Sequence, residues 1–247
     1  MSFDTPSFCS SLPGSSPAPL RILYQDDDLV AIHKPAGHVV HRTKLCPDAP
    51  VILGQLRDQL GRFLYPIHRL DRATCGILLF GFSAAAAGAV CQSFMEKNVT
   101  KRYWAVVRGW TDEEGVIDHA YVETKGKPPR PAVTRFRRLA TCELPIALPP
   151  YATCRYSLVQ VEPETGRTHQ IRRHFKHINH PVIGDTEHGR GEHNRLFREH
   201  FGIRRLLLQA IHVTLPHPAT GEPLTIQDTL DAEFADLFDT LGWPVDR

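Results

Sequence analysis

The chain has 247 residues, with 29 lysines and arginines against 27 aspartates and glutamates, so that its formal net charge is +2. This length fits one large domain and does not require two, and the near balance of charge excludes binding to nucleic acid through net charge alone. No apolar stretch is long enough to cross a bilayer, and neither a signal peptide nor a C-x-x-C pair accompanies the six cysteines. We therefore expect a reduced, cytoplasmic, monomeric protein without a membrane partner.

The first part of the chain predicts a tail, a hairpin and a helix. Residues 1–20 are rich in Ser and Pro and have almost no charge, so we expect a disordered tail there and a single domain over residues 21–247. Two short runs, Arg21–Tyr24 and Leu29–His33, flank an Asp-rich turn and predict a hairpin. The apolar spacing over residues 52–60 predicts a helix that the following glycine ends.

The middle of the chain predicts a buried strand, a helix and a strand with two distinct faces. The run from Ile77 to Phe82 is apolar enough for a buried strand, and Ser83 can cap the alanine-rich helix that follows. Residues 103–107 alternate with the period of a strand. The segment from Thr111 to Pro150 is rich in proline, so we expect irregular insertions around one strand at residues 133–139.

The last part of the chain predicts two strands and two helices. Residues 154–161 and 206–215 have the pattern of strands, and residues 169–178 that of a helix with one apolar face. A stripe of Phe and Leu predicts a final helix, which Gly242 ends. Strands interrupted irregularly by single helices argue for an α+β fold with a mixed, largely antiparallel central sheet, rather than for βαβ repeats.

One loop of the sequence carries a carboxylate between two arginines. The residues His68-Arg69-Leu70-Asp71-Arg72-Ala73-Thr74-Cys75-Gly76 come just ahead of the predicted buried strand. Flanking positive charge favours the ionised form of a carboxylate, which is the form that a nucleophile or a base needs. Taken alone, such a pattern is more often a surface pair of Arg and Asp.

This loop is the first of three motifs that follow one another along the chain. Residues 68–76 have the pattern HRLD-x-x-T-x-G, residues 101–109 the pattern K-x-Y-x-A-x-V-x-G, and residues 166–174 read GRTHQIRRH. In this order the motifs resemble the signatures of the RluA family of pseudouridine synthases. Residues 29–37 and 180–185 also resemble the opening hairpin and a later H-P-[IV]-x-G-D turn of that family.

The resemblance covers about residues 21–228 and implies the pseudouridine synthase fold, with isomerisation of a uridine in RNA and neither cofactor nor metal. It implies that Asp71 is the catalytic carboxylate, that Arg172 pairs with it and that Tyr103 stacks on the base. Arg69 resembles the family residue that enters the duplex when the target nucleotide is flipped out. Many members carry a small S4-like RNA-binding domain before the catalytic one, which we do not expect here.

Two clusters of basic residues are candidates for contacts to RNA phosphates. One cluster lies between residues 125 and 138 and the other between residues 167 and 176. Charge alone is equally compatible with a solvated face. From these clusters we expect RNA contacts by Arg135, Arg137, Arg167, Arg173 and Lys176.

The fourteen histidines also raise the possibility of a metal site. His174, His177 and His180 are spaced by three residues, but Asn179 and Pro181 should end the helix before His180 shares a face with the other two. No further ligand spacing completes a zinc site. We therefore expect no bound metal.

Within the family, several segments resemble the branch that modifies uridine 65 in the T-arm stem of tRNA. They are Pro131–Pro145, the doubled arginine before His174, and residues 183–189. A tRNA substrate is therefore preferred, with ribosomal RNA as the alternative partner and a non-catalytic RNA-binding protein as the alternative function. The chain departs from the family pattern at Cys75, where Ser is usual, and at Gln209, where His is usual.

Overall fold

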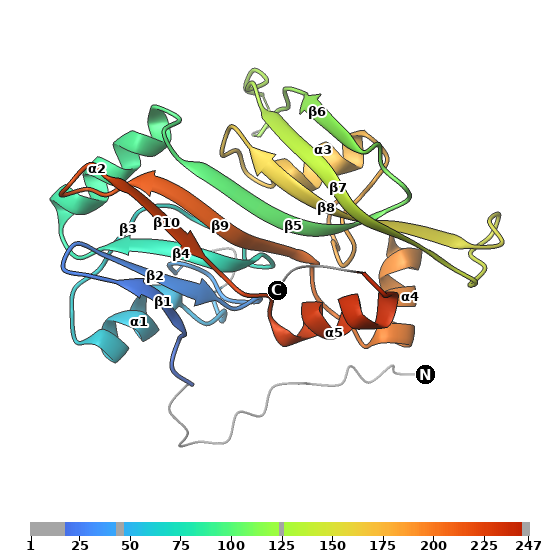
Figure 1. Cartoon of the computed structure of the whole chain (residues 1–247), viewed down its shortest axis with the longest axis horizontal. Helices are drawn as coiled ribbons and strands as arrows, with labels where there is room; N and C mark the ends of the chain where they lie inside the picture. Colours follow the sequence, from blue (N-terminus) through green and yellow to red (C-terminus); the bar gives the residue numbers. More distant parts are fainter. Residues whose placement is uncertain (1–17, 43–46, 124–125, 244–247) are drawn as a thin grey trace.

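The computed structural model describes residues 18–42, 47–123 and 126–243. Within them the chain forms one ten-stranded sheet (Figure 1). The strands are β1 Ile22–Gln25, β2 Leu29–Lys34, β3 Tyr65–Pro66, β4 Cys75–Gly81, β5 Thr100–Arg108, β6 Glu114–Asp118, β7 Val133–Leu144, β8 Cys154–Pro163, β9 Leu208–Pro216 and β10 Pro223–Gln227. The helices are α1 Ile52–Leu60, α2 Ala84–Met95, α3 Gln170–His177, α4 Gly191–Phe201 and α5 Ala232–Leu241.

The sheet is mixed because one central pair of strands is parallel. The strand order is β1-β2-β4-β9-β5-β8-β7-β6, with β10 paired to β9 and β3 to β4. β4 and β9 run parallel where Cys75 and Gly76 face Gln209 and Ala210, and the other pairs of strands are antiparallel. The predicted α+β fold with a mixed, largely antiparallel sheet is therefore confirmed.

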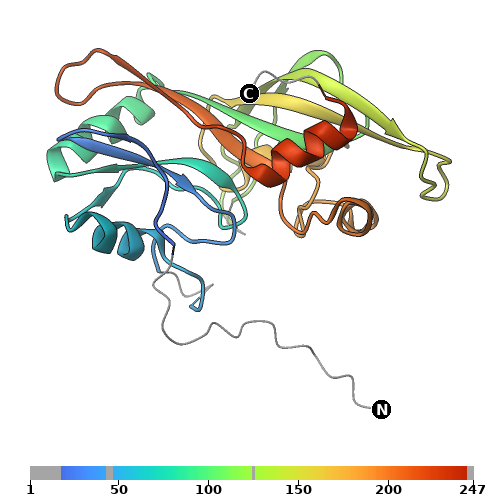
Figure 2. The same cartoon turned by 60° about the horizontal axis from the view of Figure 1, so that its bottom comes forward.

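Helices cover both faces of this sheet. Along β5, Ala105 and Val107 pack with α3 on one face, whereas Trp104 and Val106 pack with α4 and α5 on the other. Tyr103 contacts both the cluster under α1 and the cluster under α3, so these two helices cover the same face. In Figure 2, α1 lies next to the β1–β2 hairpin, while α4 and α5 lie together at the other side of the molecule.

The expected elements are present, with two corrections. The segment Thr111–Pro150 contains more strand than expected, because β6 pairs with β7 and β7 continues to Leu144 along β8. The pairing partners supply the backbone hydrogen bonds of these strands, which strand propensity alone does not reveal. The sequence pattern also does not predict α4. This helix starts at Gly191 after Arg190, which provides no capping side chain.

The expected tail of residues 1–20 falls largely outside the described residues. Leu20, at its end, is buried against α1, and its backbone N–H donates to the Gln59 side chain at 2.7 Å. The packed part of the chain therefore includes Leu20. Among the described helices, none has the length and apolar character needed to cross a membrane.

Candidate active site

The loop that carries Asp71 is anchored from below by a buried lysine. The Lys34 ammonium is fully buried and donates to the carbonyl oxygens of Pro35 and His38, both at 2.9 Å, and of Arg72 at 3.3 Å. The Arg72 carbonyl also accepts from the backbone N–H of Gly37 at 2.8 Å. Burial lowers the pKa of Lys34 to about 8. This network connects the hairpin strand β2 to the residue next to Asp71.

Two further contacts hold the loop against β4. His68 Nε2 accepts a hydrogen bond from the backbone N–H of Leu79 at 3.2 Å, and burial lowers the pKa of this imidazole to about 4. The Leu70 side chain is buried in the cluster under α1, and the Thr74 N–H donates to the Asp71 carbonyl at 3.1 Å. Since the neighbours of Asp71 are fixed in this way, its carboxylate has a defined position.

Arg172 approaches Asp71 from α3. Its guanidinium Nη1 lies 3.3 Å from Asp71 Oδ2, and its Nε and Nη2 donate to the two oxygens of Asp185 at 2.7 and 2.8 Å. The Asp71 side chain is 28% exposed, whereas those of Arg172 and Asp185 are 7% and 1% exposed. The bonds to Asp185 raise the pKa of Arg172, despite its burial. A permanently charged, oriented guanidinium therefore faces a carboxylate that solvent can reach.

Two histidines extend this cluster. His169, in the left-handed conformation with φ of 55°, places Nε2 3.9 Å from Asp71 Oδ2 and Nδ1 3.0 Å from His188 Nε2. Glu187 lies beside both, 3.3 Å from His169 Nδ1. Burial lowers the pKa of His188.

Tyr103 lies on the face of the sheet that α1 and α3 cover, between the areas under these two helices. Its ring packs against the clusters under both α1 and α3, next to a register shift between Arg102 and Tyr103 in the pairing of β5 with β9. Burial, with a smaller effect of the Asp71 charge, raises the pKa of the Tyr103 phenol above its ordinary value. The phenol is therefore protonated at neutral pH, close to the carboxylate.

Comparison with known proteins identifies the family of the chain. The sequence model of the RNA pseudouridylate synthase family matches residues 28–177. The chain belongs to this family.

Individual members are similar over almost the whole chain. tRNA pseudouridine synthase C of Salmonella typhi is 46% identical over 91% of this chain and 90% of its own length. The protein of that name from Vibrio cholerae serotype O1 is 45% identical over 91% of this chain and 96% of its own. The solved structure of human RNA pseudouridylate synthase domain containing 1 superposes with a TM-score of 0.70 at 25% identity, covering 96% of this chain and 100% of that one.

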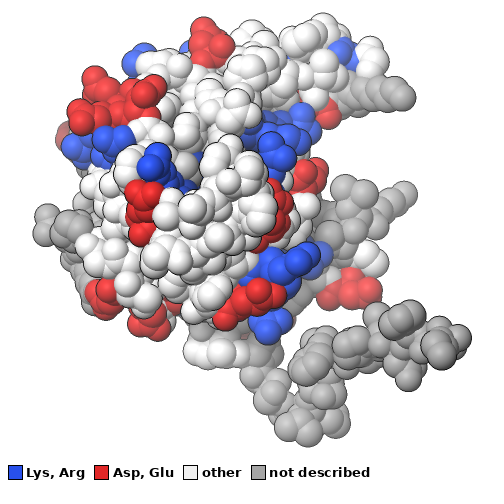
Figure 3. Space-filling model, turned by 90° about the vertical axis from the view of Figure 1, so that its right-hand side faces the viewer, with Lys and Arg blue, Asp and Glu red and all other residues white. Residues whose placement is uncertain are grey.

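In this pseudouridine synthase some of the residues expected to contact RNA are exposed, and others make contacts within the protein. Arg69 and Arg137 are exposed, and Arg135 pairs with Glu164 at 2.6 Å. Arg173 donates to the Val122 carbonyl at 3.2 Å. Figure 3 shows the Lys and Arg side chains of one face in separate groups, next to groups of Asp and Glu.

The remaining expected residues lie near α3. Arg167, in the loop before α3, donates to the Pro131 carbonyl at 3.3 Å, and Lys176 is exposed on the last turn of the helix. Lys125, a member of the first basic cluster, lies outside the described residues.

The histidine run considered as a metal site is dispersed. His174 is buried and contacts the His119 carbonyl at 3.1 Å, while the His177 ring stacks on the His119 ring. Among the described residues, two other groups have ligand atoms close enough to share a cation, and they are His169, Glu187 and His188, and Asp26, Asp28 and His217.

Sequence reasoning missed the residues that support Arg172. Asp185 is the buried partner of the guanidinium, and Glu187 and His188 follow it in the same turn. The signal was available, because Asp185 ends the H-P-[IV]-x-G-D motif, whose role the sequence left undefined. At the two positions that depart from the family pattern, the Cys75 thiol lies 3.2 Å from Arg205 Nη1, and the Gln209 amide donates to the Thr229 carbonyl at 2.9 Å.

Proposed function

We propose that this pseudouridine synthase converts uridine 65 in the T-arm stem of tRNA to pseudouridine, with Asp71 as its catalytic carboxylate. The observation that carries the proposal is the ion pair between Asp71 Oδ2 and Arg172 Nη1, 3.3 Å apart, beside Tyr103. The choice of tRNA rests on the similarity, over 91% of the chain, to proteins named tRNA pseudouridine synthase C.

The chemistry sets clear demands on such a site. The bond between N1 of the base and C1′ of the ribose breaks, the base turns, C5 bonds to C1′, and the proton that leaves C5 is balanced by one that N1 gains. No electrons are exchanged with a second reactant, and no group is transferred. The reaction needs an ionised carboxylate close to the sugar, a cation beside that carboxylate, and a flat group that retains the freed base.

Asp71 and Arg172 fit the first two of these demands. The carboxylate is partly exposed, so a flipped-out nucleotide can reach it, and Arg172 stabilises its charged form at close range. Because Asp185 already uses two guanidinium nitrogens, Arg172 is held in one orientation toward Asp71. The carboxylate then acts at the ribose, either by attack on C1′ or by removal of the 2′ proton.

Tyr103 and Arg69 fit the handling of the base. The Tyr103 ring stacks on the uracil, and because its phenol is protonated it does not serve as a resting base. Arg69 is exposed two positions before Asp71, where it can enter the duplex as the uridine leaves it. Such extrusion costs a few kcal/mol, which inserted side chains help to offset.

Site mapping of pseudouridine tests the proposal. An unmodified tRNA transcript is incubated with the protein and no added metal, and carbodiimide adducts are located by primer extension. We expect one new stop in the T-arm stem for the wild type and none for Asp71→Asn, which keeps the shape of the side chain and loses its charge. Binding of the tRNA by Asp71→Asn should stay within a few-fold of the wild type.

The other outcomes are equally informative. A stop on ribosomal RNA in place of tRNA would retain the chemistry and overturn the substrate. Substantial turnover by Asp71→Asn would overturn its role. RNA binding by the wild type without conversion of either RNA would favour a non-catalytic RNA-binding protein.

A further inference from the structure

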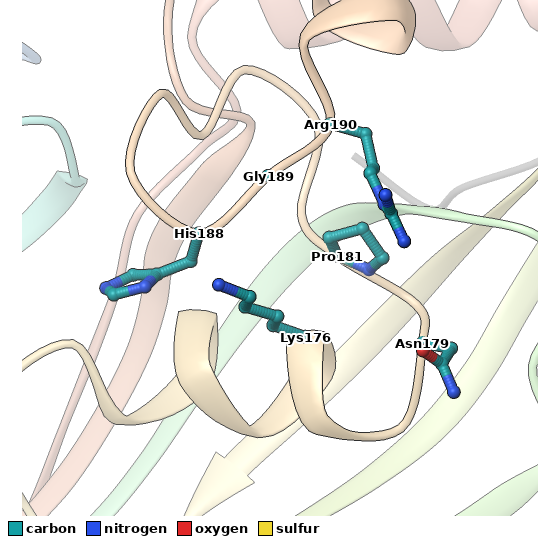
Figure 4. Close-up of a pocket in the computed structure, with 6 residues that line it drawn as sticks. All are labelled: Lys176, Asn179, Pro181, His188, Gly189 and Arg190. Atoms are coloured by element: carbon teal, nitrogen blue, oxygen red, sulfur yellow. The ribbon is translucent and has the colours of Figure 1, made fainter.

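A basic pocket opens beside the site, between the last turn of α3 and the loop before α4. It has a volume of about 270 Å³ and is lined by Lys176, Asn179, Pro181, His188, Gly189 and Arg190. Figure 4 shows Lys176 projecting from α3 toward the loop of His188 and Gly189, and Arg190 projecting on the side of Pro181 and Asn179. Two cations and no carboxylate therefore line this pocket.

The two cations have no anionic partner in the described part of the chain. Neither Lys176 nor Arg190 makes an ion pair there, whereas Arg130 and Arg135 are each paired with a glutamate. The nearby Glu187 carboxylate is engaged with Arg172, 3.4 Å away. An anion entering the pocket would thus meet two cations without displacing an internal carboxylate, and both side chains are suited to phosphate.

The pocket is physically continuous with the catalytic cluster. His188, in its wall, lies 3.0 Å from His169, and His169 lies 3.9 Å from Asp71. The backbone N–H of His188 donates to Asp185 Oδ1, as does that of Glu187, both at 2.9 Å. One turn therefore carries both the partner of Arg172 and a wall of the pocket.

Gly189 makes this turn tight. A Cβ atom at Gly189 would lie only 2.2 Å from the Asp185 carbonyl oxygen, so a larger residue would open the turn. The distance between the pocket wall and the site at Asp71 is therefore fixed by packing within the turn.

We propose that this pocket binds a backbone phosphate of the RNA strand that carries the target uridine, close to that nucleotide. The inference rests on the proposed function for the identity of the RNA. The role of the pocket is to hold the RNA strand in register while the uridine turns toward Asp71. Lys176 supplies a mobile point charge and Arg190 a planar donor, while the loop of His188 and Gly189 forms the wall between the phosphate and the catalytic cluster.

The test compares Lys176→Met, Arg190→Met and the double variant with Arg198→Met. Arg198 is an exposed arginine on α4 that lines no part of the pocket, so its variant removes the same charge elsewhere. Affinity for the tRNA transcript is measured by fluorescence anisotropy across a salt series, and turnover at saturating RNA is measured separately. We expect several-fold weaker binding for each pocket variant, a salt slope reduced by about 1, and a lower turnover at saturating RNA, because the strand is no longer held in register while the uridine turns toward Asp71.

Neutral methylphosphonate linkages placed one at a time around the target uridine identify the ligand. We expect one linkage to weaken binding by the wild type and by Arg198→Met, but not to weaken it further in the double variant. Pocket variants that match Arg198→Met in affinity and salt slope would overturn the proposal, as would a double variant that still responds to every linkage. If the wild type converts ribosomal RNA in place of tRNA, the proposed substrate fails, and the same comparison on that RNA still judges the pocket.

Discussion

Arg172 Nη1 lies 3.3 Å from Asp71 Oδ2, although 101 residues separate the two in the chain. Through Nε and Nη2 the same guanidinium donates to Asp185, which is almost fully buried. The position of the arginine relative to the carboxylate is therefore set by a residue that we do not expect to touch the substrate. Asp185 is a positioning residue in this arrangement.

Asp185→Asn tests this role. The change keeps the volume and removes the charge, leaving Arg172 buried beside an uncharged amide, so we expect the free energy of unfolding to fall by about 3 kcal/mol. Turnover should fall by more than RNA affinity does, since Arg172 loses its orientation. Chemical denaturation, together with kcat and KM for the RNA, measures these effects. Glu187→Gln is the matched control, and equal effects of the two changes would contradict the assignment.

Lys34→Met tests the anchor of the Asp71 loop. The methionine fills the buried space but donates no hydrogen bond, so the carbonyls of Pro35, His38 and Arg72 lose a common donor. We expect a large loss of kcat with RNA affinity close to the wild type. Lys101→Met is the control, because Lys101 is a half-buried lysine whose pKa is likewise lowered to about 8. Similar losses of kcat in both variants would show that the anchor has no specific role.

The pKa of Lys34, lowered from 10.5 to about 8, gives opposite trends for stability and activity. Between pH 8 and 10.5 the unfolded chain binds this proton more tightly than the folded one, so the contribution of Lys34 to the free energy of unfolding rises with pH. A neutral amine has only two N–H donors for three carbonyls, so turnover should fall above pH 8. Chemical denaturation at each pH measures the trend in stability, and single-turnover rates measure the trend in activity. Both are compared between the wild type and Lys34→Met. A difference in stability that decreases with pH would refute this sign.

Cys75 should be chemically inert in the folded protein. Its thiol is fully buried, and burial is the largest of the effects that raise its pKa to about 12, so almost no thiolate is present at neutral pH. We expect iodoacetamide to leave Cys75 unmodified until the protein is unfolded, as seen by mass spectrometry of its peptides. Cys75→Ser should keep most of the turnover. Rapid modification of native Cys75 would be incompatible with this burial.

Gly76→Ala and Gly54→Ala should have opposite effects on stability. At Gly76 a Cβ would clash with the Ala210 carbonyl at the parallel contact of β4 and β9, and φ is +106°, so we expect severe destabilisation. Gly54 lies inside α1 with open space around the added carbon, so alanine there should stabilise by about 0.5–1 kcal/mol. Thermal unfolding of the two variants provides the comparison, and a neutral Gly76→Ala would rule out the close contact.

Much of the fold follows from local patterns in the chain. The alternation along β5 predicts its two faces, and Ser83 and Gly61 occupy the caps expected of them at α2 and α1. These features depend on neighbours within a few residues, so the sequence contains the information directly. The extension of β7 to Leu144 does not follow from a local pattern, because its stability comes from pairing with β8.

One part of the candidate site likewise follows from the sequence, and the other part follows only from the tertiary structure. The sequence by itself determined the ordered motifs that contain Asp71, Tyr103 and Arg172, because a motif is a local arrangement of residue types. Only the tertiary structure decided that Arg172 is buried against Asp185 and that His169 and His188 connect Asp71 to a basic pocket. These contacts arise where α3 packs beside the turn at residues 185–189 and faces the Asp71 loop, and no spacing along the chain encodes that proximity.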